Sequence, residues 1–330
     1  MKSASNKFLD IELDFTSGAQ FVPIELEFIQ LDTVCDQEIY LKVEGKFVLY
    51  RAASLPFRLE DKNRLEAAKT QVVFIAVRSE KELRSFYEKN LTNIIENEQI
   101  DVKKKASILY TCAMGIAHDV FDRPHTSETI NSSRVIVENT IRMLGKGQEA
   151  FFQMVSLSGH DYYTYTHCVN VLTFSIALLS QMGNNSPKFL KEVGMGALMH
   201  DVGKTRVPVH ILNKPGKLTE EEWVVMKKHP ILGIQIVEGQ PIPERGLDII
   251  VQHHEKRNGT GYPYGLSAWD IPIASQVVSL VDAYDAMTTD RVYQKAMKPF
   301  EALKVICTEM KDLYDMQMIE AFIKMLNLKK

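Results

Sequence analysis

Residues 190–204 read LKEVGMGALMHDVGK, an apolar helical segment that ends in a histidine, an aspartate, a glycine and a lysine. Imidazole and carboxylate together suit a borderline or hard divalent cation, and an aspartate can bridge two such ions. His200 and Asp201 are therefore candidate metal ligands. A histidine–aspartate pair is also common by chance, so this pair alone does not identify a metal site.

Histidines and an aspartate recur in four other segments of the second half of the chain. Each has a structural alternative, because a lone histidine on an apolar helix is more often a satisfied core residue than a ligand. An ionised carboxylate on an apolar helix, however, is costly to bury unless it is paired or bound to metal. Together the candidates form an ordered series, which runs His167, His200, Asp201, His229, His253, His254 and Asp282.

The two adjacent histidines of this series open the stretch HHEKRNGTGYPYGL at residues 253–266. Adjacent helical residues point about 100° apart, so two neighbouring imidazoles do not converge easily on one metal. They could serve two metals, or one could serve a metal and the other a hydrogen bond. The glycines that follow predict a special turn or the close approach of a ligand, since glycine accepts positive φ and carries no side chain.

These segments together resemble the HD-GYP branch of the HD-domain metal-dependent phosphohydrolases, over about residues 160–312. The similar stretches are HDVGK at 200–204, LNKPGKLTEEEW at 212–223, KKHPILG at 227–233, HHEKRNGTGYP at 253–263 and DAYDAMTTDRVY at 282–293. The resemblance implies an all-α, HD-type helical bundle that holds metal ions in its core.

The resemblance also implies a ligand set for two divalent metal ions. One centre would consist of His167, His200, Asp201 and Asp282, and the second of His229, His253 and His254, with Asp201 shared. Mixed imidazole and carboxylate ligands favour iron, with manganese as the alternative, over a structural zinc. Some members have a glutamate for a third metal where this chain has Tyr163, so we expect two ions and not three.

The substrate implied by the resemblance is cyclic di-GMP, hydrolysed to linear pGpG, to GMP or to both. Asp201 and Lys204 would be catalytic, and Lys204, Gly261, Tyr262 and Arg291 would contact the substrate. Lys204 would stabilise charge on the reacting phosphate. Two of these residues have structural alternatives. A lysine at a helix end often meets exposed carbonyls, and an arginine on a polar loop is often only a surface charge.

The sequence departs from the family pattern near its arginine. Gln294 stands three residues after Arg291, where the family usually has a second basic residue. This change removes one positive charge from the expected ligand site. The alternative function is therefore a weakly active or inactive metal-bound receptor for a cyclic dinucleotide, or a protein-interaction module.

The first part of the chain has a different pattern and predicts a small α+β module at residues 1–95. Its elements are strands at 21–29, 38–52 and 71–77, a turn at Glu44–Gly45 and helices at 59–69 and about 79–98, the second opening with a Ser-x-x-Glu capping box at Ser79. A helical linker region at 96–158 and an HD-GYP domain at 159–330 follow. The module could be regulatory, a dimerisation surface or a stabilising cap.

Composition restricts the remaining classes of function. The net charge of −3 argues against binding to a nucleic acid polymer. Four dispersed cysteines without a CxxC pattern predict buried thiols in a reducing compartment. The chain shows neither an apolar leader nor a run of about eighteen apolar residues. We therefore expect a cytoplasmic protein that does not enter the membrane. Protein partners could bind to the loop that contains Gly261, Tyr262 and Pro263 (the GYP loop) or to the N-terminal module.

Overall fold

The computed structural model describes residues 7–8, 11–12, 18–32, 36–157, 164–290 and 295–326. Tyr163, Arg291 and Gln294 lie outside the described residues. The chain forms two compact units, residues 1–112 and 113–330. The finer division at residues 95 and 158 stays a prediction.

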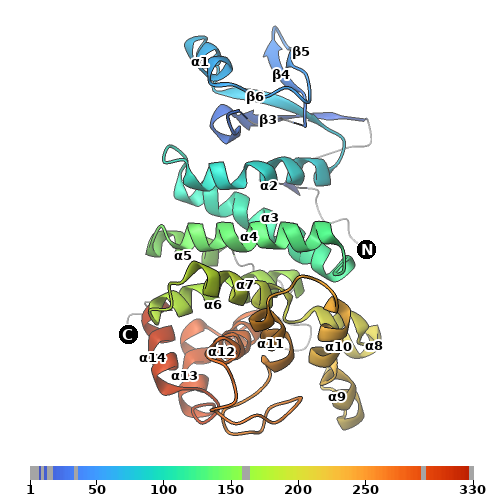
Figure 1. Ribbon diagram of the computed structural model, residues 1–330, viewed down its shortest axis with the longest axis vertical. Coiled ribbons are helices and arrows are strands. Elements are labelled where there is room, and N and C mark those ends of the chain that lie inside the picture. Colours follow the sequence, from blue (N-terminus) through green and yellow to red (C-terminus); the bar gives the residue numbers. More distant parts are fainter. Residues whose placement is uncertain are drawn as a thin grey trace. The chain divides into compact units, whose positions relative to one another are not determined.

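The first unit is built on an antiparallel sheet (Figure 1). Its strands, in the order β3-β6-β4-β5, are β3 (Gln20–Glu25), β6 (Val72–Val77), β4 (Ile39–Val43) and β5 (Lys46–Arg51), and a separate pair consists of β1 (Lys7–Phe8) and β2 (Ile11–Glu12). Glu44 and Gly45 join β4 to β5 with φ values of 48° and 82°. Positive φ at both central residues is the requirement of a type I′ hairpin turn, so the predicted turn is confirmed.

This unit also contains the helices α1 (Leu59–Ala67) and α2 (Glu80–Glu96). The main chain of Glu82 donates a hydrogen bond to the Ser79 hydroxyl, which is the predicted N-cap of α2. The Glu82 carboxylate, however, accepts from the main chain of Arg78 instead of that of Ser79, so only half of the capping box forms. The strand predicted at 21–29 is also shorter, because residues 26–28 form a turn of 3-10 helix.

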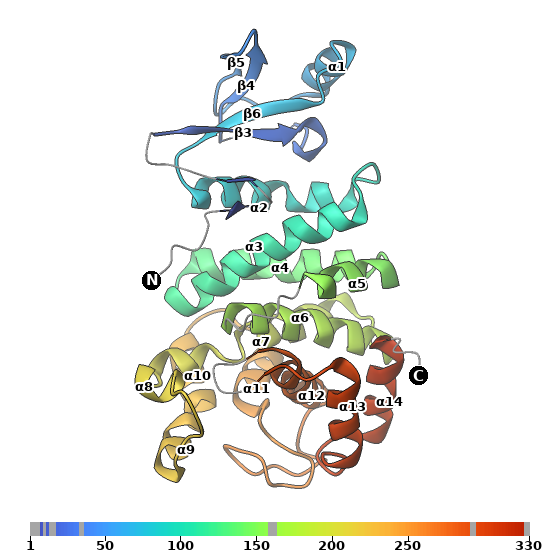
Figure 2. The same cartoon turned by 180° about the vertical axis from the view of Figure 1, so that it is seen from behind.

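The second unit is helical, and Figure 2 shows it from behind. The second unit begins within α3 (Val102–Asp122), whose first half belongs to the first unit. Its helices are α4 (Ser127–Leu144), α5 (Gln148–Ser156), α6 (Thr164–Gln181), α7 (Pro187–Met199), η3 (Val202–Arg206), α8 (Val209–Leu212), α9 (Glu220–Met226), α10 (His229–Val237), α11 (Glu244–Gln252), α12 (Ile273–Thr288), α13 (Pro299–Thr308) and α14 (Met316–Leu326). The predicted fold class, an α+β module followed by an HD-type helical bundle, is confirmed. None of the described helices is long and apolar enough to cross a membrane.

Close approach between α7 and α11 positions the ends of both helices. A Cβ at Gly196 would lie 2.9 Å from the Cα of Gly246 and 2.8 Å from the Cβ of Ile249. Only glycine allows the two helices to pack at this distance, because any side chain would overlap the opposite helix. The C-terminal ends of α7 and α11, which carry His200 and His253, are held in one place as a result.

Candidate metal centre

Five elements of the second unit direct imidazoles and carboxylates into its interior. These side chains are His167 on α6, His200 and Asp201 at the end of α7, His229 at the start of α10, His253 and His254 at the end of α11, and Asp282 on α12. Most are inaccessible to solvent, and His254 is half-buried. Burying this many polar groups is unfavourable unless their nitrogen and oxygen atoms find partners.

A first group consists of His167, His200 and Asp201, which could hold a metal ion. The Nε2 atoms of the two imidazoles lie 3.2 Å apart. Asp201 Oδ2 lies 3.6 Å from Nε2 of His167 and 3.4 Å from Nε2 of His200. Asp282 adds an oxygen 3.1 Å from Nε2 of His167. Imidazole and carboxylate atoms therefore surround one point.

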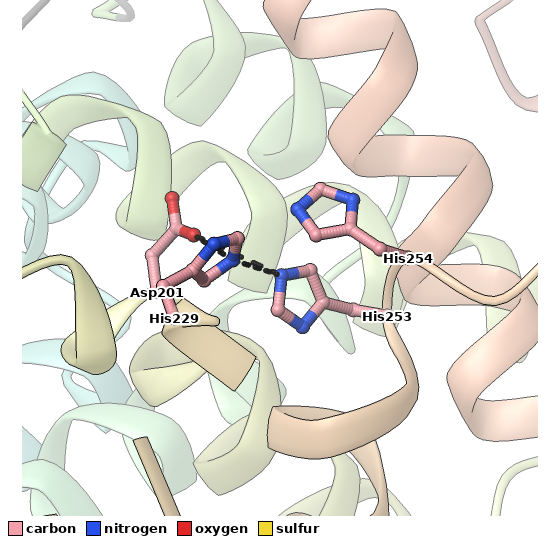
Figure 3. A group of neighbouring side chains, drawn as sticks. All are labelled: Asp201, His229, His253 and His254. Carbon is pink, nitrogen blue, oxygen red and sulfur yellow. Dashed lines mark hydrogen bonds and ion pairs between the residues drawn. The ribbon is translucent and has the colours of Figure 1, made fainter. Parts of the chain in front are cut away.

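A second group shares Asp201 and adds His229, His253 and His254 (Figure 3). The other carboxylate oxygen, Oδ1, lies 3.4 Å from Nε2 of His229 and 3.8 Å from Nε2 of His253. These two Nε2 atoms are 3.2 Å apart. His254 Nδ1 lies 3.6 Å from Asp282, which thus touches both groups. The two oxygens of Asp201 face different groups, as a bridging carboxylate requires.

Main-chain carbonyls determine the tautomers of three of these histidines. The Nδ1 atoms of His200, His229 and His253 lie 2.7, 2.9 and 3.0 Å from the carbonyl oxygens of Ala197, Met226 and Ile250. Since a carbonyl oxygen only accepts hydrogen bonds, each Nδ1 must carry the proton. In the neutral imidazole each Nε2 then carries a lone pair that points into the cluster, which is the form in which histidine binds metal.

The facing lone pairs show that this cluster fits a cation. Nε2 of His229 and Nε2 of His253 repel each other at 3.2 Å unless a positive charge lies between them. Burial lowers the pKa of His229 to about 4, so its imidazole is neutral at pH 7. Asp201 Oδ1 is buried and has no hydrogen-bond partner within the described part of the chain. A divalent metal satisfies all three atoms, and the donor set suits one.

Lys204 lies beside the shared carboxylate, its Nζ 2.5 Å from Asp201 Oδ2. Burial alone raises the pKa of Asp201, but the charge of the nearby Lys204 ammonium counters this effect, and that pKa lies well below its usual range. The carboxylate is therefore ionised and available to metal. The structure places Lys204 at the cluster, and its contact with substrate stays a prediction.

The glycine-rich loop after α11 folds back onto its own start. Positive φ occurs at Gly259 (77°) and Gly265 (66°) but not at Gly261. A Cβ at Gly261 would lie 2.4 Å from both the Cα of Glu255 and the main-chain nitrogen of Lys256. Gly261 is therefore needed for close approach to the loop's own backbone. A direct contact between Gly261 and substrate stays a prediction.

The same loop places Tyr262 against the second group. Its ring stacks on the imidazole of His254, with centroids 4.7 Å apart. Glu255, which the sequence analysis did not single out, shapes this loop. Its buried carboxylate accepts hydrogen bonds from the main chains of Tyr264 (2.6 Å) and Leu266 (2.9 Å). The position of Tyr262 is compatible with the predicted substrate contact, which stays a prediction.

Comparison with known proteins agrees with this geometry. Residues 138–318, more than half of the chain, match the family described as HD domain. The chain belongs to the HD domain family. Bd1817, an HDG"Y"P protein from Bdellovibrio bacteriovorus, has a similar structure, with a TM-score of 0.64, 26% identity and coverage of 93% of this chain and 99% of that one. The predicted resemblance to HD-GYP proteins is confirmed.

Two curated relatives are named cyclic di-GMP phosphodiesterases. The Pseudomonas aeruginosa protein is 35% identical over 60% of this chain and 47% of its own length. The Thermotoga maritima protein is 37% identical over 50% of this chain and 45% of its own length. This HD-family chain thus spans about half the length of the curated relatives it matches.

One buried carboxylate of the HD domain was missed in the sequence. Asp285 Oδ2 lies 2.7 Å from Nδ1 of His167, and its other oxygen accepts a hydrogen bond of 2.8 Å from Asn170. A carboxylate at Nδ1 keeps the proton there and leaves Nε2 free to bind metal. Asp285 lies three residues after Asp282 and therefore on the same face of the helix. This spacing could have identified Asp285 as a candidate from the sequence.

We expect Asp285→Ala to weaken metal binding about 10- to 100-fold, because His167 loses the partner that orients it. Calorimetric titration of metal-depleted protein with Mn²⁺ measures this effect. Asp312→Ala, which removes an exposed aspartate of the same unit, is the matched control and should bind Mn²⁺ like the parent. Equal affinities in the Asp285 variant and the parent would contradict the orienting role.

Proposed function

We propose that this chain is a metal-dependent phosphodiesterase that hydrolyses cyclic di-GMP to linear pGpG, to GMP or to both. The observation that carries the proposal is a buried aspartate, Asp201, whose two oxygens face two separate groups of histidine lone pairs. Such a donor arrangement suits a binuclear centre. The names of the Pseudomonas and Thermotoga relatives support the choice of substrate.

The ligands of the proposed centre follow from the two groups. His167, His200 and Asp282 would hold one ion, His229, His253 and His254 the other, and Asp201 both. We propose iron, with manganese as the alternative, since both accept mixed imidazole and carboxylate ligands. Two divalent ions bound in this way would supply an activated water and would neutralise charge on the phosphoryl oxygens.

The remaining residues of the site bind and orient the substrate in this proposal. Lys204, next to Asp201, would donate to a phosphoryl oxygen and stabilise the charge that develops there. Tyr262 would lie against the substrate at the second group, and Arg291 would pair with its phosphate or guanine edge. The packing of Gly261 on residues 254–256 keeps Tyr262 in this place.

A second function, a receptor for a cyclic dinucleotide, is kept because of two departures from the family pattern, Tyr163 and Gln294. Gln294 lacks the charge that a basic residue would provide three positions after Arg291. A site that binds a cyclic dinucleotide without reaching the geometry for in-line attack would be a receptor. A receptor and an enzyme would both bind the cyclic dinucleotide, but only the enzyme would hydrolyse it.

The test uses the full chain, depleted of metal and then loaded with iron or manganese. We expect cyclic di-GMP to be converted to linear product, detected by chromatography, and the conversion to stop when a chelator removes the metal. Calorimetry on the same samples measures binding. Binding without product would support the receptor, and neither binding nor product in metal-loaded protein would contradict both functions.

A further inference from the structure

We infer that Lys227 supplies a second cationic contact for the substrate, to the phosphate that is not at the metal centre. The inference rests on the proposed function, because it names a binding residue of that same site. Lys227 is the C-terminal cap of α9 and lies two residues before His229. Its ammonium sits over the ring of Tyr262, 5.7 Å from the centroid.

The ring of Tyr262 connects Lys227 to the metal-site histidines. Tyr262 stacks on His254 at 4.7 Å and meets the ring of His229 edge-on at 6.4 Å. A ligand that reaches the second group of histidines and extends over Tyr262 therefore comes within reach of the Lys227 ammonium. The loop that carries Tyr262 is held in place by two main-chain hydrogen bonds to the carboxylate of Glu255.

Lys227 differs from three other described cations of the second unit, which are paired with carboxylates. Lys204 is paired with Asp201, Lys214 with Glu222 and Arg257 with Asp315. Within the described part of the chain, no carboxylate lies within ion-pair distance of Lys227, and this residue is exposed. An anionic ligand thus meets in Lys227 a cation that has no carboxylate partner to give up.

The chemistry of the proposed substrate calls for such a group. A cyclic dinucleotide carries two phosphates on opposite sides of one ring, and only one can lie at the metal centre during hydrolysis. Lys204 serves the metal side, next to Asp201. Arg291 is the proposed partner of the second phosphate or of a guanine edge, and Gln294 leaves it without a second cation. A charge-assisted hydrogen bond from an ammonium would supply that charge. The Lys227 ammonium lies over the ring of Tyr262, 5.7 Å from its centroid, and we expect the second phosphate to lie within its reach.

The adjacent lysine offers a matched control. Lys228 is exposed like Lys227 and caps the start of α10, but it makes no ring contact with Tyr262 within the described structure. Both substitutions remove one charge from the same short segment. Any difference between Lys227→Ala and Lys228→Ala therefore reports the position of the ammonium over Tyr262, and not the net charge of the protein.

The experiment measures kcat and KM for cyclic di-GMP on metal-loaded protein, with bis(p-nitrophenyl) phosphate as a second substrate that has one phosphate. For Lys227→Ala we expect KM for cyclic di-GMP to rise about three- to tenfold, with kcat little changed, since one exposed charge contact is lost. The ratio of kcat/KM between the two substrates should fall by the same factor. Lys227→Arg should restore most of the loss, and Lys228→Ala should behave like the parent.

Ionic strength adds a readout that a purely structural role would not move. Salt screens an exposed charge contact, so the difference in KM between parent and Lys227→Ala should shrink as salt is raised. Equal effects of Lys227→Ala and Lys228→Ala, or equal losses on both substrates, would overturn the inference. If the parent binds cyclic di-GMP without hydrolysing it, the enzyme proposal fails but the inference about Lys227 does not. The dissociation constants of the same variants for cyclic di-GMP are then compared by calorimetry. Unchanged affinity in Lys227→Ala would then overturn the inference.

Discussion

Asp201→Ala is expected to abolish binding of both metal ions, and hydrolysis with it. Asp201 is the one described side chain that belongs to both groups, with Oδ2 facing His167 and His200 and Oδ1 facing the second group. Without Asp201, each group keeps only its imidazoles and the carboxylate of Asp282. Metal analysis after loading and dialysis should show less than about a tenth of the parent content, because a bridging ligand acts on both ions.

The control for this variant is Asp248→Ala, which removes a half-buried aspartate of α11 outside the cluster. It should retain metal at the parent level. His229→Ala is informative alongside it, because it removes a ligand from the second group only and should lower metal content by about half. Full metal content in Asp201→Ala would show that the carboxylate is not a shared ligand.

Gly203→Ala is expected to destabilise the second unit and to displace His229. A Cβ at Gly203 would lie only 1.8 Å from the carbonyl oxygen of His229 and 2.6 Å from the main-chain nitrogen of Gly233. Both atoms belong to the backbone of α10, so the overlap cannot be relieved by a side-chain rotation. The start of α10 must move away from Asp201, whose Oδ1 is 3.4 Å from His229 Nε2.

We expect a loss of about 3 kcal/mol in the free energy of unfolding, at the upper end for overpacked interiors. Metal affinity should fall about 10- to 100-fold, since a ligand is moved out of place. Urea unfolding and Mn²⁺ titration measure the two effects. Gly145→Ala is the control, because its backbone is helical (φ −62°) and its Cβ would come no closer than 3.3 Å to another atom. If Gly203→Ala matched this control, the close packing of η3 on α10 would not matter.

Much of the fold could be read from local patterns in the sequence. The Glu44–Gly45 turn follows from residues that tolerate positive φ, and the start of α2 follows from the hydroxyl of Ser79. Helical periodicity separated the second unit from the strand-rich first one. In each case the deciding interactions join residues only a few positions apart, so the sequence order already brings them together.

The candidate site was readable for a different reason. The residue types in the series from His167 to Asp282 are rare on apolar helices, and the sequence segments around them resemble those of a known family. The types and the order of the candidate ligands could therefore be predicted. Their identification as ligands is still a prediction, and so are the contacts assigned to Arg291, which lies outside the described residues.

Tertiary structure alone decided how these residues act on one another. The orientation of His167 depends on Asp285, 118 positions away, and the sheet order β3-β6-β4-β5 joins strands that do not follow each other in the chain. The need for glycine at position 261 was predicted from a special φ or an approaching ligand, yet it arises from packing against residues 254–256. Periodicity and residue type describe the face that a segment presents. Which distant segment meets that face is determined only when the whole core packs, because contacts of this kind depend on the shape of both partners.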